Sequence, residues 1–212
     1  MIDSHKIDYS KLDTLNVSRE TFLELDEFKE MILDENKKIN LISQHTEELA
    51  RDRHIIDCAQ IIDLIDENHL SCTDLGSGSG LPGLVIAIIK KKQKSDMKFF
   101  LYEKSFKKSN FLKKVINKFE LNAEVINQDI FNQKNLISDL IVARAFKPLP
   151  IILNLVTTNF DNFKDIILFL GKSGKSSIEQ CLKKWDLEFI EKKSVTEKNS
   201  ILIKINKVIR KR

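Results

Sequence analysis

The residues best placed to do chemistry are an acid and a group of glycines near the middle of the chain. The segment DLGSGSGLPG spans Asp74 to Gly83, and Glu103 ends the next apolar run. The chain of 212 residues has six glycines, and four of them fall in this segment. Glycine tolerates positive φ and lets the backbone approach a ligand closely. The segment therefore predicts a ligand-binding loop.

The spacing of these residues indicates which ligand the loop binds. Gly78, Gly80 and Gly83 match the GxGxxG pattern of dinucleotide sites, which is a weak signal by itself. In dinucleotide sites an apolar strand runs up to the first glycine, whereas Asp74 and Gly76 interrupt it here. An acid at a strand end followed by GxGxG is instead typical of S-adenosylmethionine sites.

S-adenosylmethionine carries an ammonium, a carboxylate and a sulfonium but no phosphate. The Asp74 carboxylate is predicted to lie near the positive groups, and Gly76, Gly78 and Gly80 to let the backbone approach the methionine part. Glu103 is predicted to accept hydrogen bonds from both ribose hydroxyls. A tight turn beside a surface glutamate is the alternative explanation of the same residues.

A second glycine cluster, GKSGKS, spans Gly171 to Ser176 and has the Gly-Lys-Ser end of a phosphate-binding P-loop. In the pattern GxxxxGK[ST] the first glycine would fall on Ile166 or Phe169, so the pattern is not met. We therefore predict a strand that leads into a Ser-capped helix.

Two helices are predicted before the glycine loop. The first runs from Ser18 as N-cap to about Ile39 and the second from Thr46 as N-cap to about Ile65. The apolar residues expected on the buried side of the second helix are Leu49, Ile56, Ile61 and Leu64.

After residue 70 short apolar runs alternate with helical patterns. Strands are predicted at 72–75, 98–102, 123–126, 140–143, 166–170, 189–194 and 201–205, and helices at 81–91, 106–119, after 150 and at 176–184. This alternation predicts a mainly parallel α/β sheet, with the last two strands as an antiparallel hairpin at one edge. We predict an N-terminal helical extension over 1–70, packed on a domain over 71–212.

Composition limits the class of protein. Apolar residues make up 42% and charged residues 31%, which excludes a disordered polymer, and the apolar runs are too short to span a membrane. Cys58, Cys72 and Cys181 form no CxxC pair, which argues against a zinc knuckle or a disulfide scaffold. The N-terminal segment MIDSHKIDYS has no apolar signal core, so we expect a cytoplasmic protein. The net charge of +4 suits an anionic partner.

Four blocks of residues resemble the glucose-inhibited division protein B family, and they stand in that family's order. They span Asn40 to Ser43, Arg53 to Asp57, Asp74 to Gly83 and Ala143 to Phe146. The third block, with its Leu-Pro-Gly ending, is far more specific than a generic GxGxG. The family comprises bacterial enzymes that methylate N7 of a guanine in 16S ribosomal RNA of the small ribosomal subunit.

The resemblance implies a fold, a cofactor and a target. The fold is a Rossmann-like class I S-adenosylmethionine-dependent methyltransferase, an α/β fold with a seven-stranded, mostly parallel sheet. The target is the guanine at position 527 in the 530 loop. Cofactor contacts are implied at the positions that match Gly76, Leu81, Ile130, Phe131 and Arg144, and the family's acidic ribose ligand falls on Glu103.

The sequence departs from the family's pattern at three places. Cys58 stands where the family often has Ser. Ile130 and Phe131 replace a common Ala-Glu pair, which removes a carboxylate that Asp129 can replace. Gly171-Lys172 replaces a usual Lys-Gly, which leaves the role of the lysine open.

Methylation of guanine N7 sets the expected catalytic groups. N7 carries an in-plane lone pair, so the reaction needs no base, no triad and no metal, and positioning should dominate. Arg144 is predicted to hydrogen-bond the guanine O6 or a phosphate and to orient the cofactor; an arginine paired with a surface acid is the alternative. His54 and Asp57 share a helical face and either line the pocket or form a structural hydrogen bond.

An RNA substrate requires an electropositive surface. Six lysines and no acid occur from Lys104 to Lys118. The residues predicted to bind RNA are Lys107, Lys108, Lys114 and Lys118.

Two other functions remain open from the sequence. A small-molecule methyltransferase would use the same fold but would need an apolar lid rather than lysines around the mouth. A non-catalytic RNA-binding or assembly factor would not need Asp74, Glu103 and Arg144 together. We expect a monomer that acts on 16S rRNA, on the small subunit or on one of its assembly intermediates.

Overall fold

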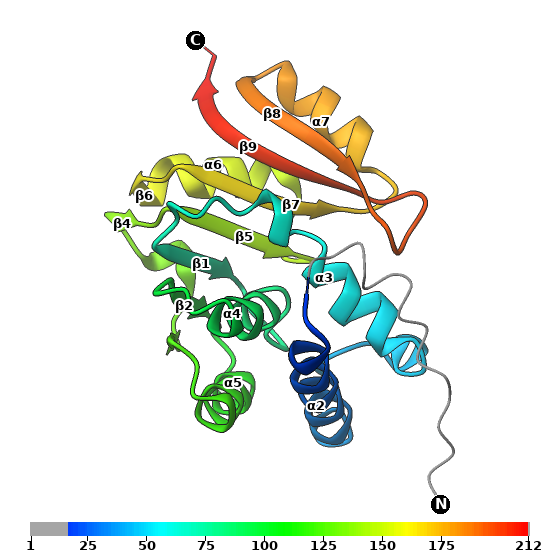
Figure 1. Cartoon of the computed structure of the whole chain (residues 1–212). Coiled ribbons are helices and arrows are strands. Elements are labelled where there is room, and N and C mark those ends of the chain that lie inside the picture. Colours follow the sequence, from blue (N-terminus) through cyan, green and yellow to red (C-terminus); the bar gives the residue numbers. More distant parts are fainter. Residues whose placement is uncertain (1–16, 212) are drawn as a thin grey trace, which may run out of the picture.

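A seven-stranded sheet forms the centre of the molecule, in the order β3-β2-β1-β5-β7-β9-β8 (Figure 1). The computed structural model describes residues 17–211, so the N-terminal segment used for the expected location lies outside the described residues. The strands are β1 (Ser71–Leu75), β2 (Lys98–Tyr102), β3 (Ala123–Ile126), β5 (Leu140–Arg144), β7 (Asp165–Leu170), β8 (Trp185–Lys193) and β9 (Ile201–Arg210). β9 runs antiparallel to β7 and β8, and the other pairings are parallel. The predicted sheet and its edge hairpin are confirmed.

The chain order reverses beside β1, where β2 lies on one side and β5 on the other. In open parallel sheets the carboxyl ends of the strands at such a reversal form a crevice that binds ligands. Asp74 lies near the end of β1 and Arg144 ends β5, so both lie at this edge.

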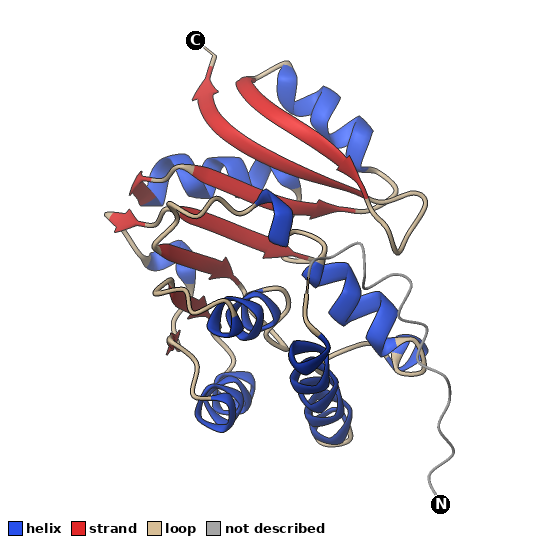
Figure 2. Ribbon diagram, viewed as in Figure 1, coloured by secondary structure: helices blue, strands red, loops and turns tan. Residues whose placement is uncertain are grey.

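Helices cover both faces of the sheet (Figures 1 and 2). One face carries α2 (Arg19–Asn36), α4 (Gly83–Lys92) and α5 (Phe106–Phe119), and the other carries α6 (Leu149–Asn159) and α7 (Gly174–Leu182). α5 is amphipathic, because its apolar residues recur at helical spacing. The buried apolar ones are Phe111, Leu112, Val115 and Phe119.

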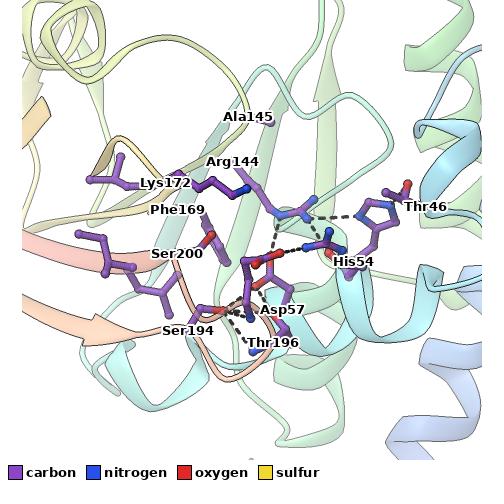
Figure 3. A pocket seen from close by; sticks show the side chains of 16 residues that line it. Thr46, His54, Asp57, Arg144, Ala145, Phe169, Lys172, Ser194, Thr196 and Ser200 are labelled. Carbon is purple, nitrogen blue, oxygen red and sulfur yellow. Dashed lines mark hydrogen bonds and ion pairs between the residues drawn. The ribbon is translucent and has the colours of Figure 1, made fainter. Parts of the chain in front are cut away.

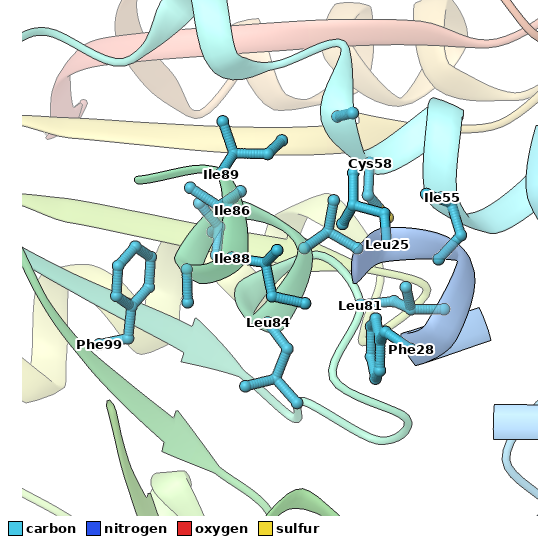
Figure 4. Packing of buried hydrophobic residues seen from close by; sticks show 14 of the residues in the cluster. Leu25, Phe28, Ile55, Cys58, Leu81, Leu84, Ile86, Ile88, Ile89 and Phe99 are labelled. Atoms are coloured by element: carbon cyan, nitrogen blue, oxygen red, sulfur yellow. The ribbon is translucent and has the colours of Figure 1, made fainter. Parts of the chain in front are cut away.

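The N-terminal helix shares its core with the sheet domain. Leu25 and Phe28 of α2 belong to the same buried cluster as Leu81 and Leu84 (Figure 4). α2 ends at Asn36, before the predicted Ile39, because the Asn36 Oδ1 accepts hydrogen bonds from the backbone N–H of Leu41 at 2.7 Å and of Ile42 at 3.0 Å. The chain turns at that point. The division at residue 70 stays a prediction.

The predicted second helix, 46–65, is wrong as a single helix. The segment contains η1 (Gln44–Thr46), η2 (Arg51–Ile56, a π-helix), α3 (Asp57–Ala59) and η3 (Ile62–Leu64). Thr46 is not an N-cap, because its hydroxyl donates to the Ser43 carbonyl at 2.7 Å instead of capping a helix. Leu49 is 54% exposed rather than buried. π-helical turns are frequent at functional sites.

The remaining differences lie between and at the ends of predicted elements. β8 and β9 are longer than predicted, so Lys207 and Arg210 lie within a strand. α7 begins at Gly174, earlier than the predicted start. The connection from β3 to β5 holds η4 (Ile130–Asn132) and β4 (Leu136–Ile137), which pairs with β6 (Phe160–Asn162).

Within residues 17–211, none of the helices is both long and apolar enough to cross a membrane.

Candidate functional site

The glycine loop lies at the carboxyl end of β1, as its sequence predicts. Gly76, Gly78 and Gly80 have φ of 66°, 57° and 87°, in the left-handed region that favours glycine. A Cβ added to Gly76 would overlap the ring of Phe146, and one added to Gly80 would lie 2.5 Å from a Leu84 methyl carbon. The backbone conformation and the close packing therefore both require glycine at these two positions.

Glu103 holds the loop from the end of β2. Its Oε2 accepts the backbone N–H of Gly78 at 2.9 Å, and its Oε1 accepts that of Ser105 at 2.7 Å. A carboxylate has about four lone-pair positions, so each oxygen can still accept a hydrogen bond from a ribose hydroxyl. The side chain is buried but lines a cavity, which suits the predicted ribose contact.

This first cavity, the loop cavity, has a volume of about 230 Å³. Five of the predicted cofactor residues line it, namely Gly76, Glu103, Asp129, Ile130 and Phe131, and the lining also includes Phe146, Ala145 and Lys104. The Phe131 and Phe146 rings stack with their centroids 5.9 Å apart. Asp129 accepts the backbone N–H of Phe131 at 3.2 Å, which fixes the turn that presents this ring.

Asp74 does not line the loop cavity, and the predicted approach of its carboxylate to the positive groups of the cofactor stays a prediction. It is 1% exposed, and its Oδ2 accepts the backbone N–H of Gly83 at 3.1 Å, which fixes the start of α4 behind the loop. Burial raises the pKa of Asp74 to about 7. Its Oδ1 is buried without a hydrogen-bond partner. Gly78, Gly80 and Leu81 also lie outside the lining of this cavity.

A second cavity, the hairpin cavity, has a volume of about 430 Å³ and adjoins the first. It lies between the end of β5, the π-helix η2, the end of β7 and the loop that connects β8 to β9 (Figure 3). Ala145 lines both cavities. Arg144, His54 and Asp57 line the hairpin cavity, so the predicted arginine lies at the junction of the two.

Asp57 joins three segments of the chain at one carboxylate. Its Oδ2 accepts Arg144 Nε–H at 3.0 Å. Its Oδ1 accepts the Thr196 hydroxyl at 2.6 Å, the Ser194 hydroxyl at 3.3 Å and the Gln60 amide N–H at 2.8 Å. The structure therefore gives Asp57 a positioning role in the lining of the cavity.

His54 is neutral and receives a hydrogen bond from Arg144. Arg144 Nη2 lies 2.6 Å from the Arg53 carbonyl and 3.3 Å from His54 Nδ1. Arginine only donates, so Nδ1 accepts and Nε2 carries the proton that His54 donates to the Thr46 hydroxyl at 2.9 Å. Burial, and then the charge of Arg144, lowers the pKa of His54 to about 4. His54 thus helps to orient Arg144.

Three cationic side chains line the hairpin cavity. Arg144 is paired with Asp57, and Arg53 is paired with Glu197 on the β8–β9 loop. Lys172 extends into the cavity (Figure 3) and has no carboxylate partner among residues 17–211. The cavity therefore suits an anionic ligand.

The lysines predicted to bind RNA fall into two groups. Lys114 pairs with Glu35 at 3.3 Å, and Lys118 pairs with Glu27 at 2.8 Å, both on α2. Lys107 and Lys108, in the first turn of α5, have no carboxylate partner in the described part of the chain. The structure thus separates the lysines predicted to bind RNA into a paired group and a free group.

A group with metal-ligand chemistry lies at the opposite edge of the sheet. Asp66, His69 and Asp165 approach one another, but the Lys204 ammonium lies 2.6 Å from Asp66 Oδ2 and 3.0 Å from Asp165 Oδ2. A lysine therefore supplies the positive charge in this group. It is remote from the carboxyl ends of the strands, where both cavities lie.

Sequence reasoning missed several residues of the site. Phe146 appears in the sequence analysis only as the last residue of a family block. Nothing in the residues around it indicates that its ring stacks on Phe131. Thr46, Ser194 and Thr196 belong to no motif that indicates a site. They reach the site through contacts between segments far apart in the sequence, as the separation of 139 residues between Asp57 and Thr196 illustrates.

Comparisons with known proteins show what the chain is similar to. The family model described as GidB, rRNA small subunit methyltransferase G, matches residues 22–204. Proteins named ribosomal RNA small subunit methyltransferase G are 49% identical in Pelagibacter ubique, over 96% of each chain, and 36% identical in Bartonella tribocorum, over 91% of each chain.

Solved structures share the fold at low sequence identity. A SAM-dependent methyltransferase from Aquifex aeolicus has a TM-score of 0.55 at 12% identity, covering 85% of this chain and 97% of its own. The 16S rRNA methylase RmtB has a TM-score of 0.55 at 13% identity, covering 90% of this chain and 76% of its own. The predicted class I methyltransferase fold is confirmed.

Proposed function

The chain belongs to the glucose-inhibited division protein B family of small-subunit rRNA methyltransferases, and from this premise we propose its cofactor, its target atom and the roles of its residues. The cofactor is S-adenosylmethionine, and the target is N7 of guanine 527 in 16S rRNA. The protein acts in the cytoplasm, as a monomer, on the small ribosomal subunit or an assembly intermediate.

The loop cavity fits the adenosyl part of the cofactor. Glu103 keeps free lone pairs for two ribose hydroxyls, and the rings of Phe131 and Phe146 offer aromatic faces to adenine. Gly76 lets the backbone approach without a side chain. The contacts implied at Leu81 and Ile130 would be made by the main chain, because both side chains are buried. Asp74 would act from behind, through Gly83.

The hairpin cavity fits the target nucleoside. The single observation that carries this assignment is that Ala145 lines both cavities, so ligands in the two meet beside Arg144. A cavity of this size beside the strand ends can take a base that has left its stack, as enzymes that modify bases generally require. Lys172, which has no carboxylate partner in the described part of the chain, would bind an attached phosphate.

Positioning, rather than proton transfer, carries the reaction. When bound, S-adenosylmethionine supplies an electrophilic methyl group. Asp57, His54 and the Arg53 carbonyl occupy the donors on Nε and Nη2 of Arg144, which leaves the two N–H groups of Nη1 for a ligand. Donation to guanine O6 would orient the base while leaving the N7 lone pair free to react.

Methyl transfer to purified small subunits that lack the modification tests the proposal. Mass spectrometry of the digested 16S rRNA should show one added methyl group on guanine 527 and none on other guanines. Binding of S-adenosylmethionine without transfer to RNA would favour a small-molecule methyltransferase. RNA binding without cofactor binding would favour a non-catalytic assembly factor.

A further inference from the structure

One aromatic side chain, Phe106, lies exposed in the first turn of α5, close to the loop cavity. It is 67% exposed, whereas Phe111 and Phe119 of the same helix are buried. Glu103 and Lys104, which line the loop cavity, precede it in the chain. Single exposed apolar residues are common on protein surfaces, so the surroundings decide whether this one has a role.

The helix face that carries Phe106 is polar and cationic. Phe106, Asn110 and Lys113 have the i, i+4, i+7 spacing that places side chains on one helical face. Lys107 follows directly, and no acid occurs from Lys104 to Lys118. The exposed ring of Phe106 therefore shares a helical face with one amide and one cation.

These cations are available to a ligand. Lys107, Lys108 and Lys113 have no carboxylate partner among residues 17–211. Farther along the same helix, Lys114 and Lys118 are paired with acids of α2. The free lysines thus lie between the first turn of α5, which carries the exposed ring, and the middle of the helix.

We propose that Phe106 stacks on an unpaired base of the RNA that flanks the target guanine, while Lys107 and Lys113 bind the adjoining phosphates. This inference rests on the proposed function. Aromatic rings interleaved with cations bind single-stranded RNA, because every base offers a face for stacking and every nucleotide a phosphate. A protein partner fits less well, since stable protein interfaces bury about 800 Å² per partner around an apolar core, and Phe106 is a single exposed ring on a polar helix face.

Two substitutions at position 106 separate stacking from simple apolar burial. Phe106→Leu keeps an apolar side chain but removes the aromatic face, and Phe106→Tyr keeps that face. The Leu variant should bind a naked stem-loop RNA that contains the target guanine about tenfold more weakly, and the Tyr variant should bind like wild type. Ile190→Ala, at a residue of β8 that is 58% exposed, is the control and should not alter RNA affinity.

The melting temperature and the S-adenosylmethionine affinity of all three variants should equal those of the wild type. Equal affinity of the Leu variant and the wild type for the naked RNA would overturn the inference. A loss seen only with intact 30S particles would also overturn it, because the ring would then contact a ribosomal protein. Methyl transfer by the wild type to small subunits that lack the modification is measured in parallel. A wild type that transfers no methyl group would overturn the proposed function, and this inference with it.

Discussion

Arg144 at the end of β5 donates a hydrogen bond from Nε to Asp57 Oδ2 over 3.0 Å, across 87 residues of sequence. The same carboxylate accepts the Thr196 hydroxyl from the β8–β9 loop. The sheet, the N-terminal segment and the C-terminal hairpin are therefore joined at one ion pair that lines the hairpin cavity. Because this pair fixes the guanidinium, its partners determine the direction of the N–H groups that, in the proposed function, would hold the base.

Replacement of Arg144 should affect methyl transfer more than replacement of His54. Arg144→Ala should lower the single-turnover rate at saturating RNA and cofactor about 100-fold, a loss comparable to that of one positioned donor in other active sites. Arg144→Lys should recover only part of it, because lysine lacks the planar fork. His54→Gln should stay within about tenfold, because His54 is a neutral support and no base is needed. A dead His54 variant beside a normal Arg144→Ala would contradict this mechanism.

The neutral state of His54 makes the fold sensitive to acid. The pKa of His54 is about 4 in the folded protein, against about 6.5 in an unfolded chain. Between pH 6.5 and 4 the imidazole of His54 is therefore protonated in the unfolded chain but still neutral in the folded protein. The contribution of His54 to stability is thus present above pH 6.5 and is lost as the pH falls towards 4. The loss should approach about 3 kcal/mol.

Urea unfolding at pH 7.5, 6 and 5 measures this loss. As the pH is lowered from 7.5 to 5, the free energy of unfolding should decrease less for His54→Gln than for the wild type. His45→Gln, at an exposed histidine, is the matched control and should follow the wild type. Parallel pH profiles for the wild type and His54→Gln would show that His54 is not the group responsible.

Two glycine substitutions compare the binding loop with an open position. Gly76→Ala should abolish measurable S-adenosylmethionine binding, because φ is +66° and the added Cβ would overlap the Phe146 ring. Gly171→Ala should bind the cofactor normally, because no atom lies within 4 Å of the added carbon. Isothermal titration calorimetry measures both affinities, and circular dichroism checks that both variants fold. Normal binding by Gly76→Ala would place the cofactor elsewhere.

The sequence predicts best those elements whose signals are local. α5, at 106–119, matches its predicted bounds, because Ser105 caps it and its apolar residues keep helical spacing. β2 and β3 also match. The π-helix η2 was missed, because its apolar pattern is the same as that of an α-helix. Within it, His54 contacts Thr46 and Arg144, and no local pattern indicates these contacts.

The candidate site divides in the same way. Local spacing and family blocks predict the glycine loop, Glu103 and Arg144, and the structure places all three at the carboxyl ends of the strands. No local pattern predicts the hydrogen bond from Thr196 to Asp57, because the two residues lie 139 positions apart in the sequence. Asp74 lies outside the lining of the loop cavity, and its predicted approach to the cofactor stays a prediction. A carboxylate at a strand end can face the ligand or the first turn of the next helix, and spacing does not distinguish the two.

A change from carboxylate to amide at Glu103 tests how the acid holds the loop. Both of its oxygens accept backbone N–H groups, so Glu103→Gln would point an amide N–H at a donor. We expect this variant to weaken S-adenosylmethionine binding about as much as Glu103→Ala, by about 1 to 3 kcal/mol. Calorimetry should show both losses. Wild-type affinity in Glu103→Gln would mean that the charge and second acceptor are not needed.

The free and the paired lysines of α5 should differ in their effect on RNA affinity. Lys107→Glu with Lys108→Glu should lower RNA affinity and flatten its dependence on salt, because fewer counterions are released from the phosphates. Lys114→Glu with Lys118→Glu should act chiefly on stability, because the new acids would face Glu35 and Glu27 of α2. The expected destabilisation is small, because solvent screens pairs between exposed charges. Filter binding at several salt concentrations and thermal unfolding give the two readouts. Equal salt slopes for the two double variants would show that both halves of the helix meet RNA and that the pairs with α2 open when it binds.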